Sequence, residues 1–203
     1  MNELLPYYSK NTIEAGCDEA GRGCLAGPVV AAAVILNPKK PIEGLNDSKK
    51  ITEKTRLILQ KDIYKNAFDY GIGIVSNSEI DEINILNASF LAMHRAILNM
   101  NHRPEHLIID GNRFNPFEDI PFKCIIKGDA KYQSIAAASI LAKTHRDALM
   151  IQLGQKFQEY HWHSNKGYPT VKHRKAIKKF GACEYHRKSF NLLGNESQLN
   201  LFD

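Results

Sequence analysis

Apolar residues in this chain gather into short runs separated by polar segments, a pattern that predicts alternating strands and helices. Residues 25–36 form a nearly continuous apolar run rich in β-branched side chains, which suits a strand buried on both faces. Residues 12–18 and 70–75 predict two further strands. Two more apolar runs, at 106–110 and from 122 onward, each lead into an acid beside a glycine. The pattern therefore predicts five strands.

Helical spacing occupies most of the intervals between these runs. Four helices are expected: 53–66 with Thr52 as its N-cap, a second one capped by Ser78, a long one over 131–159, and a basic one from Thr170 to about 180. The order of these elements indicates a mixed α/β sheet covered by helices, followed by a helical C-terminal lobe.

Composition narrows the class of protein. The chain has 203 residues, 43% hydrophobic and 24% charged, which is ordinary for one sizeable globular domain. No apolar run is long enough to span a bilayer, and the N-terminus lacks the layout of a signal peptide. The four cysteines show no metal-ligand spacing. We therefore expect a cytoplasmic protein with reduced thiols, and nothing in the sequence requires more than a monomer.

Positive charge is concentrated in one part of the chain. Residues 166–188, called the basic stretch below, hold eight Lys and Arg against one acid, Glu184, while residues 1–165 hold 19 of each sign. A clustered basic patch is the usual footprint of a polyphosphate partner such as a nucleic acid. A solvated surface helix would have the same composition, so charge alone does not decide between the two.

Four carboxylates share one local setting at the ends of predicted strands, with a glycine within two residues. They are called the four acids below: Asp18, Glu19, Asp110 and Asp129. Acids at strand ends of an open sheet converge where ligands usually bind. Adjacent side chains on a strand point to opposite faces, so Asp18 and Glu19 serve one site only if the strand ends or bends there. Gly21 and Gly23 make such a bend inexpensive.

Clustered carboxylates repel one another and favour a divalent cation with a preference for oxygen, such as Mg²⁺. Two such ions can stabilise the entering and leaving oxygens of an in-line displacement at phosphorus. Together with the basic stretch, the four acids indicate phosphodiester hydrolysis. The alternative is four unrelated loop acids, and the shared setting counts against it.

These residues resemble the ribonuclease HII family, the type 2 ribonucleases H, over nearly the whole chain to about residue 190. The resemblance rests on the following ordered segments: Asp18-Glu19-Ala20-Gly21-Arg22-Gly23, Gly27-Pro28-Val29, Asp47-Ser48-Lys49, Ile109-Asp110-Gly111, Lys127-Gly128-Asp129, 134–143 and Gly167-Tyr168-Pro169-Thr170. It implies a ribonuclease H-like fold with a five-stranded mixed sheet flanked by helices. It also implies one catalytic domain over 1–190, including the basic helical lobe, and a tail over 191–203.

The resemblance further implies an endonuclease that cuts the RNA strand of RNA–DNA hybrids and cuts 5′ of ribonucleotides embedded in duplex DNA. The four acids would be the catalytic and metal-binding residues, with Mn²⁺ or Mg²⁺ as the ion. Gly21-Arg22-Gly23 and Tyr168 would sense the ribose 2′-OH, the group that separates RNA from DNA. Tyr168 could otherwise simply close the turn before the last helix. Four polar residues, which could also be ordinary surface residues, are candidate phosphate contacts: Lys49, Ser139, Lys143 and Arg146.

The C-terminal tail carries a separate signal. Residues 198–202, Gln-Leu-Asn-Leu-Phe, are similar to the short motif by which bacterial proteins dock onto the replicative sliding clamp. The candidate clamp-binding residues are Gln198, Leu199, Leu201 and Phe202. The alternative is a terminus folded back onto its own domain.

Three other functions compete with this interpretation. A non-catalytic nucleic-acid-binding module would explain the basic stretch but not the four acids. A junction resolvase would keep the carboxylates but not Gly-Arg-Gly with a distant tyrosine. Ribonuclease HIII resembles the same core with an extra N-terminal domain, for which the position of Asp18 is expected to leave no room.

Overall fold

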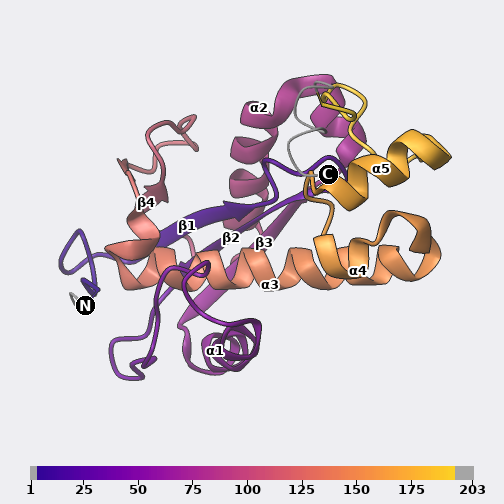
Figure 1. Ribbon diagram of the computed structural model, residues 1–203. Coiled ribbons are helices and arrows are strands. Elements are labelled where there is room, and N and C mark those ends of the chain that lie inside the picture. Colours follow the sequence, from indigo (N-terminus) through magenta and orange to yellow (C-terminus); the bar gives the residue numbers. More distant parts are fainter. Residues whose placement is uncertain (1–3, 195–203) are drawn as a thin grey trace.

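A five-stranded mixed sheet forms the centre of the protein (Figure 1). The computed structural model describes residues 4–194. The strand order is β3-β2-β1-β4-β5, with β1 paired antiparallel to β2 and parallel to β4. The strands are β1 (Glu14–Ala20), β2 (Val29–Ile35), β3 (Asp69–Val75), β4 (His106–Asp110) and β5 (Phe122–Ile125). The expected fold class is confirmed.

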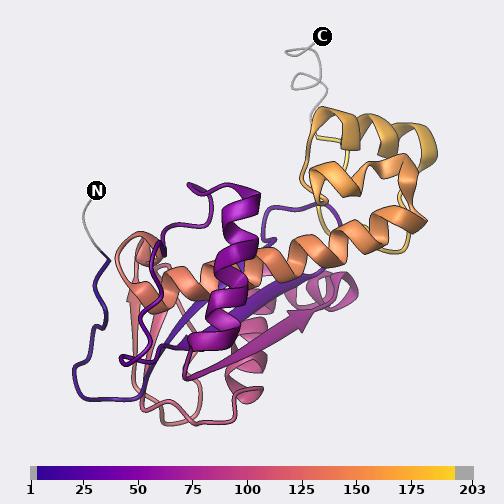
Figure 2. The same ribbon diagram turned by 90° about the horizontal axis from the view of Figure 1, so that it is seen from below.

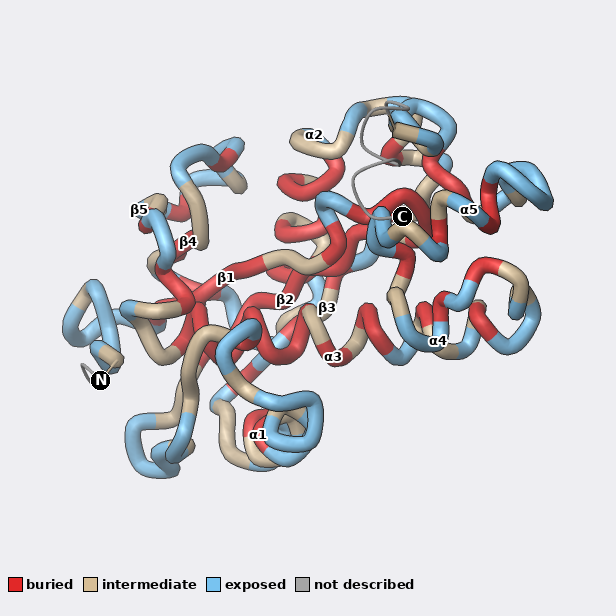
Figure 3. Tube along the Cα trace, viewed as in Figure 1, coloured by how far each residue is buried: buried red, intermediate tan, exposed pale blue. Residues whose placement is uncertain are grey.

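Helices cover both faces of the sheet. Helix α2 (Asn77–Leu98) packs on β2 and β3 from one side, and α3 (Gln133–Lys156) packs on β1 and β2 from the other, beside α1 (Glu53–Asn66). Every residue of β2 is buried, as its alanine- and valine-rich sequence requires between two helical layers (Figure 3). The two faces carry separate apolar clusters, one under α2 and one under α1 and α3.

Several element boundaries differ from those expected. Strand β1 continues through both acids to Ala20, because it pairs with β2 as far as Val30. The apolar residues before Val29 form a loop that packs into the C-terminal lobe. Ser76, and not Ser78, caps α2, since Ser76 and Glu79 make a reciprocal capping box. Thr52 caps α1, as expected, and Thr170, the expected start of the basic helix, is the N-cap of α5.

The C-terminal lobe extends beyond one end of the sheet, where the second half of α3 leads into it (Figure 2). It contains η2 (Gln158–Tyr160), α4 (Trp162–Asn165) and α5 (Val171–Phe180). Its core joins residues of α3, α4 and α5 to Leu25 and Ala26 from the loop after β1. The lobe is therefore built around the segment that follows the first two acids. Within residues 4–194, no helix combines the length and apolarity needed to cross a membrane.

Candidate active site

Asp18 and Asp110 occupy neighbouring positions on two adjacent parallel strands. Cys17 of β1 is in register with Ile109 of β4, so the next positions along the strands are Asp18 and Asp110. Neighbours in register present their side chains on the same face of a sheet. That face is the one covered by α3, since Ile108 of β4 packs against Ile135. Two acids separated by 92 positions thus meet at one edge of the sheet.

Asp18 is buried, and several groups act on its charge. Its carboxylate accepts a 2.7 Å hydrogen bond from the backbone N–H of Glu19 and a further bond from Ser139 of α3. Burial raises the pKa of Asp18 well above its ordinary value, and the charges of Glu19 and Asp110 add to this shift. Removing water and gathering like charges both disfavour the ionised form, so this position gains most from a bound cation.

Glu19 follows on the same strand, and alternation sends its side chain toward the other face. Its carboxylate forms an ion pair of 3.1 Å with Arg22. Burial raises the pKa of Glu19; Arg22 opposes that shift and Asp110 adds to it. The expected bend falls after Ala20, where Gly21 has a φ of 100°. Glu19 therefore lies one residue before the end of β1, within electrostatic reach of Asp110.

Asp110 and Asp129 are connected through the intervening glycine. The backbone N–H of Gly128 donates a 2.7 Å hydrogen bond to the Asp110 carboxylate. Asp129 is buried in the 3-10 turn η1 (Gly128–Ala130), and burial and the Asp110 charge raise its pKa, while Lys49 lowers it. The expectation that Asp129 ends a strand is wrong, because β5 ends at Ile125 and a left-handed residue, Lys127, turns the chain into η1.

The donor set of this site fits a hard divalent cation. Each of the four acids offers carboxylate oxygens; burial raises the pKa of Asp18, Glu19 and Asp129, and the nearby Asp110 charge adds to all three shifts. Within residues 4–194, no three His, Cys, Asp or Glu side chains are arranged as a ready-made metal cage. Mg²⁺ does not need one, because it keeps several waters and binds through one or two carboxylates plus substrate phosphates.

Two buried arginines, Arg146 and Arg187, support the Gly21-Arg22-Gly23 segment from the protein interior. Arg146 of α3 donates to the carbonyls of Ala26, Pro28 and Lys166, at 2.8–3.1 Å. Arg187 donates to the carbonyls of Arg22, Gly27 and Pro28, at 2.9–3.1 Å. A Cβ on Gly21 would lie 2.0 Å from Nε of Arg146, so the close approach requires glycine.

These contacts correct two of the expected substrate contacts. Arg146 is fully buried and three of its guanidinium N–H groups donate to carbonyls, so it supports the loop and does not reach the surface. Ser139 is also buried, and its hydroxyl lies 2.7 Å from that of Ser48. Arg187 and Ser48 were not among the candidate site residues. The only signals for them were an arginine in an otherwise exposed basic stretch and a serine beside Lys49.

Tyr168 lies on the surface above this support. Its ring is partly exposed, and the charged groups of Lys143 and Arg146 lie 5.5 and 5.7 Å from its centroid. Lys143 also donates a 2.7 Å bond to Asp147. The carbonyl of the preceding residue, Gly167, accepts a 2.8 Å bond from the N–H of Leu25. The segment that carries Tyr168 is thus joined directly to the loop after Gly21-Arg22-Gly23.

Some residues of the basic stretch are buried, but many of its lysines are exposed. Arg187 and His173 are buried, whereas Lys172, Lys178 and Lys179 are exposed on or near α5. Lys49 is exposed beside the four acids, close enough to lower the pKa of Asp129. The exposed lysines retain the charge that a phosphate backbone would meet.

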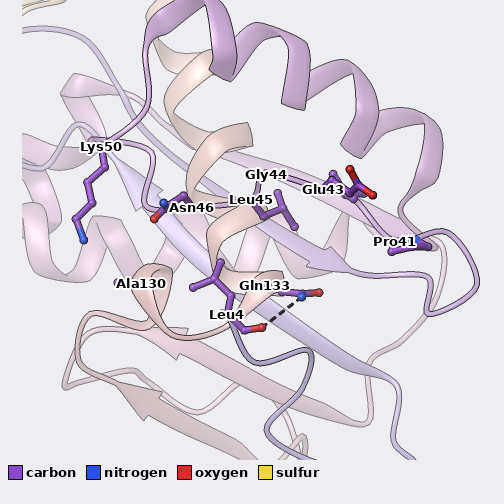
Figure 4. A pocket seen from close by; sticks show the side chains of 10 residues that line it. Leu4, Pro41, Glu43, Gly44, Leu45, Asn46, Lys50, Ala130 and Gln133 are labelled. Carbon is purple, nitrogen blue, oxygen red and sulfur yellow. Dashed lines mark hydrogen bonds between the residues drawn. The ribbon is translucent and has the colours of Figure 1, made fainter. Parts of the chain in front are cut away.

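A hollow of about 830 Å³ lies beside the site (Figure 4). Its walls include Asn46 and Ala130, the sequence neighbours of Asp47 and Asp129, and Lys50 points into the same region. A hydrogen bond of 3.3 Å from Gln133 to the Leu4 carbonyl closes one side. None of the four acids lines this hollow, so it is separate from the acid site.

Comparison with known proteins gives one consistent family. A family model for ribonuclease HII matches residues 15–193. A ribonuclease HII from Bacteroides thetaiotaomicron is 62% identical over 198 residues, 98% of each chain.

Solved structures agree with this result. The RNase HII in its complex with PCNA from Archaeoglobus fulgidus has a TM-score of 0.75 at 28% identity, over 88% of this chain and 95% of that one. Bst-RNase HIII in complex with Mn²⁺ has a TM-score of 0.70 at 20% identity, over 89% of this chain and 67% of that one, a likeness of fold. The candidate clamp-binding residues 198–202 lie outside the described residues.

Proposed function

The chain belongs to the ribonuclease HII family, the divalent-metal-dependent endoribonucleases that cleave RNA in RNA–DNA hybrids and at ribonucleotides in DNA, and we propose that the four acids perform this cleavage. The observation that carries the proposal is the register of β1 and β4, which gives Asp18 and Asp110 neighbouring positions on one face of the sheet. Asp129 joins them through the hydrogen bond from Gly128 to Asp110.

The four acids would hold Mn²⁺ or Mg²⁺, and Asp18, buried among like charges, is the strongest candidate ligand. When bound, such an ion neutralises the charge of the scissile phosphate and activates water. Hydrogen bonds within the protein hold the carboxylates in place. Ser139 and the backbone N–H of Glu19 donate to Asp18, and the backbone N–H of Gly128 donates to Asp110. The products are a 3′-OH and a 5′-phosphate.

Recognition of the ribonucleotide belongs, in this proposal, to Gly21-Arg22-Gly23 and Tyr168. The exposed backbone at Gly23 offers polar groups to a 2′-OH, and the partly exposed ring of Tyr168 offers a surface for the next sugar. Arg146 and Arg187 support both elements by holding the carbonyls between them. Lys49 and Lys143 are the proposed phosphate contacts, and the exposed lysines of the basic stretch extend that surface.

From the sequence we propose a catalytic domain over 1–190 and a tail over 191–203 that binds the sliding clamp. The Archaeoglobus fulgidus protein in its complex with PCNA supports a clamp partner for this chain. A pull-down by the bacterial clamp tests the tail, with the full chain expected to bind and a chain lacking residues 198–203 expected not to. Equal capture of both would contradict the clamp proposal.

Metal-dependent cutting of a duplex that contains one ribonucleotide is the direct test of the function. We expect cleavage 5′ of the ribonucleotide in Mn²⁺ or Mg²⁺, no cleavage in a chelator, and no cleavage of an all-DNA duplex. Cleavage of the all-DNA control at a comparable rate would favour a different nuclease on the same fold.

A further inference from the structure

Two histidine rings meet inside the C-terminal lobe, below the segment that carries Tyr168. His173 of α5 and His186 are both fully buried, and their Nε2 atoms lie 3.2 Å apart. The indole N–H of Trp162 lies 2.9 Å from the same Nε2 of His173. The other nitrogen of His173, Nδ1, lies 2.9 Å from the backbone carbonyl of Tyr168.

The partners of these rings fix where each proton sits. An indole N–H can only donate, so Nε2 of His173 accepts and its proton is on Nδ1. His173 therefore donates from Nδ1 to the Tyr168 carbonyl. Nδ1 of His186 accepts from the Cys183 N–H at 3.0 Å, so its proton is on Nε2 and points to His173. The Trp162 and His186 N–H groups share the one lone pair of His173 Nε2, and every ring nitrogen has a partner with both rings neutral.

We propose that His173 is a positioning residue for substrate recognition, which acts by holding the carbonyl of Tyr168 so that the tyrosine ring meets the ribonucleotide. This inference rests on the proposed role of Tyr168. The ring is partly exposed, with Lys143 and Arg146 over its face and the buried Cys24 thiol beside its hydroxyl, so its placement also depends on how the backbone that carries it is held. The His173 bond ties that backbone to the buried core of the lobe.

The surroundings keep the network in one protonation state near neutral pH. Burial lowers the pKa of both histidines, and each is flanked by further groups that oppose a second charge. The titratable and charged groups that face the pair are Tyr160 from η2, His161 beside α4, Arg174 from α5, and Cys183 from the segment after α5. If Nε2 of His173 carried a proton, that N–H would face the N–H donors of Trp162 and His186 with no acceptor between them.

Two substitutions at this position separate its two hydrogen bonds. His173→Asn places an amide where Nδ1 lies and keeps a donor for the Tyr168 carbonyl. His173→Gln places its amide where Nε2 lies, keeps a partner for Trp162, and loses the donor to Tyr168. We expect kcat/KM for a single-ribonucleotide duplex to fall about tenfold to a hundredfold in His173→Gln, and less than about threefold in His173→Asn. A loss that follows the thermal stability of the variants instead would overturn the inference.

A double-mutant cycle with Tyr168→Ala separates this inference from the proposed function. If His173 acts through Tyr168, His173→Gln adds no further loss once the tyrosine is removed. A large Tyr168→Ala loss with an additive His173→Gln loss overturns the positioning role and leaves the recognition role intact. Wild-type cleavage by Tyr168→Ala overturns both.

Tryptophan fluorescence tests the inference with His173 and Trp162 unchanged, in case His173→Gln does not fold. Trp162 is the single tryptophan of the chain, and its indole is hydrogen-bonded to His173. In the inactive Asp110→Asn protein, we expect a ribonucleotide-containing duplex to change Trp162 emission more than an all-DNA duplex bound to the same extent. Identical emission with the two duplexes would contradict the inference.

Discussion

The backbone N–H of Gly128 donates a 2.7 Å hydrogen bond to the carboxylate of Asp110. The end of β4 and the turn that carries Asp129 are therefore fixed to each other by a single short bond. Because Asp110 is also the in-register neighbour of Asp18, its position couples three of the four acids. The charge of Asp110 contributes to the raised pKa of Asp18, Glu19 and Asp129 alike.

Replacing Asp110 with asparagine should separate activity from stability. The amide oxygen can still accept the Gly128 N–H, but the charge shared by the cluster is lost. We expect the cleavage rate to fall by about a hundredfold or more, with the metal-free protein at least as stable as the wild type because one repulsive charge is gone. Single-turnover cleavage and thermal unfolding measure the two effects. Asp119→Asn, at an exposed position away from the four acids, is the control.

Divalent ions should stabilise the folded protein through the same cluster. Because a ligand that binds only the folded state raises its stability by mass action, Mn²⁺ or Mg²⁺ should raise the melting temperature of the wild type. The rise should be much smaller in Asp18→Asn. Differential scanning fluorimetry in a chelator and across an ion titration measures it. An equal rise in both proteins would place the ion elsewhere.

The two glycines of Gly21-Arg22-Gly23 should respond differently to substitution by alanine. A Cβ on Gly21 meets the Arg146 side chain and sits at a φ of 100°, whereas a Cβ on Gly23 meets nothing within 4 Å. We expect Gly21→Ala to lower the free energy of unfolding by about 1–3 kcal/mol, and Gly23→Ala to change it by less than about 0.5 kcal/mol. Denaturant unfolding of both variants checks this. Equal stability of the two would mean that Arg146 moves aside without cost.

Much of the architecture could be predicted from the sequence, because it depends on local pattern. The apolar runs gave all five strands, Thr52 was confirmed as an N-cap, and the basic helix begins directly after Thr170, where its start was expected. The prediction that Ser78 caps α2 was wrong. Glu79 follows Ser76 by three residues, which is the spacing of a capping box and makes Ser76 the N-cap. The end of β1 was missed because pairing with β2, a tertiary contact, extends it through Glu19.

The candidate site, like the fold, could be predicted only where it depends on local sequence. Acids beside glycines at strand ends could be recognised from the local sequence. The proximity of Asp18 and Asp110 depends on the register of β1 and β4, which the local sequence does not determine. Arg146 was expected at the surface because its helical spacing matched Lys143. Its burial depends on carbonyls from residues 26 and 28, about 120 positions away, which no local pattern reveals.

The buried His186 should make the protein less stable as the solution becomes mildly acidic. Burial lowers its pKa from 6.5 to about 4, so as the pH falls the unfolded chain takes up its proton first. Between pH 6.5 and 4 the unfolded state therefore binds more protons, and the free energy of unfolding falls with decreasing pH, by about 3 kcal/mol from this group. Below pH 4 the folded state is protonated too, and the loss stops.

His186→Asn removes the titrating ring while its amide oxygen can still accept the Cys183 N–H. The variant should be less stable than the wild type at pH 7, because packing against Tyr160 is lost, but the difference should narrow toward pH 4. Urea unfolding at half-unit pH steps measures both curves, with His163→Asn at an exposed position of the same lobe as the control that should follow the wild type. Parallel curves for wild type and His186→Asn would show that His186 does not carry the acid sensitivity, since only a group that titrates differently in the two states can change the slope.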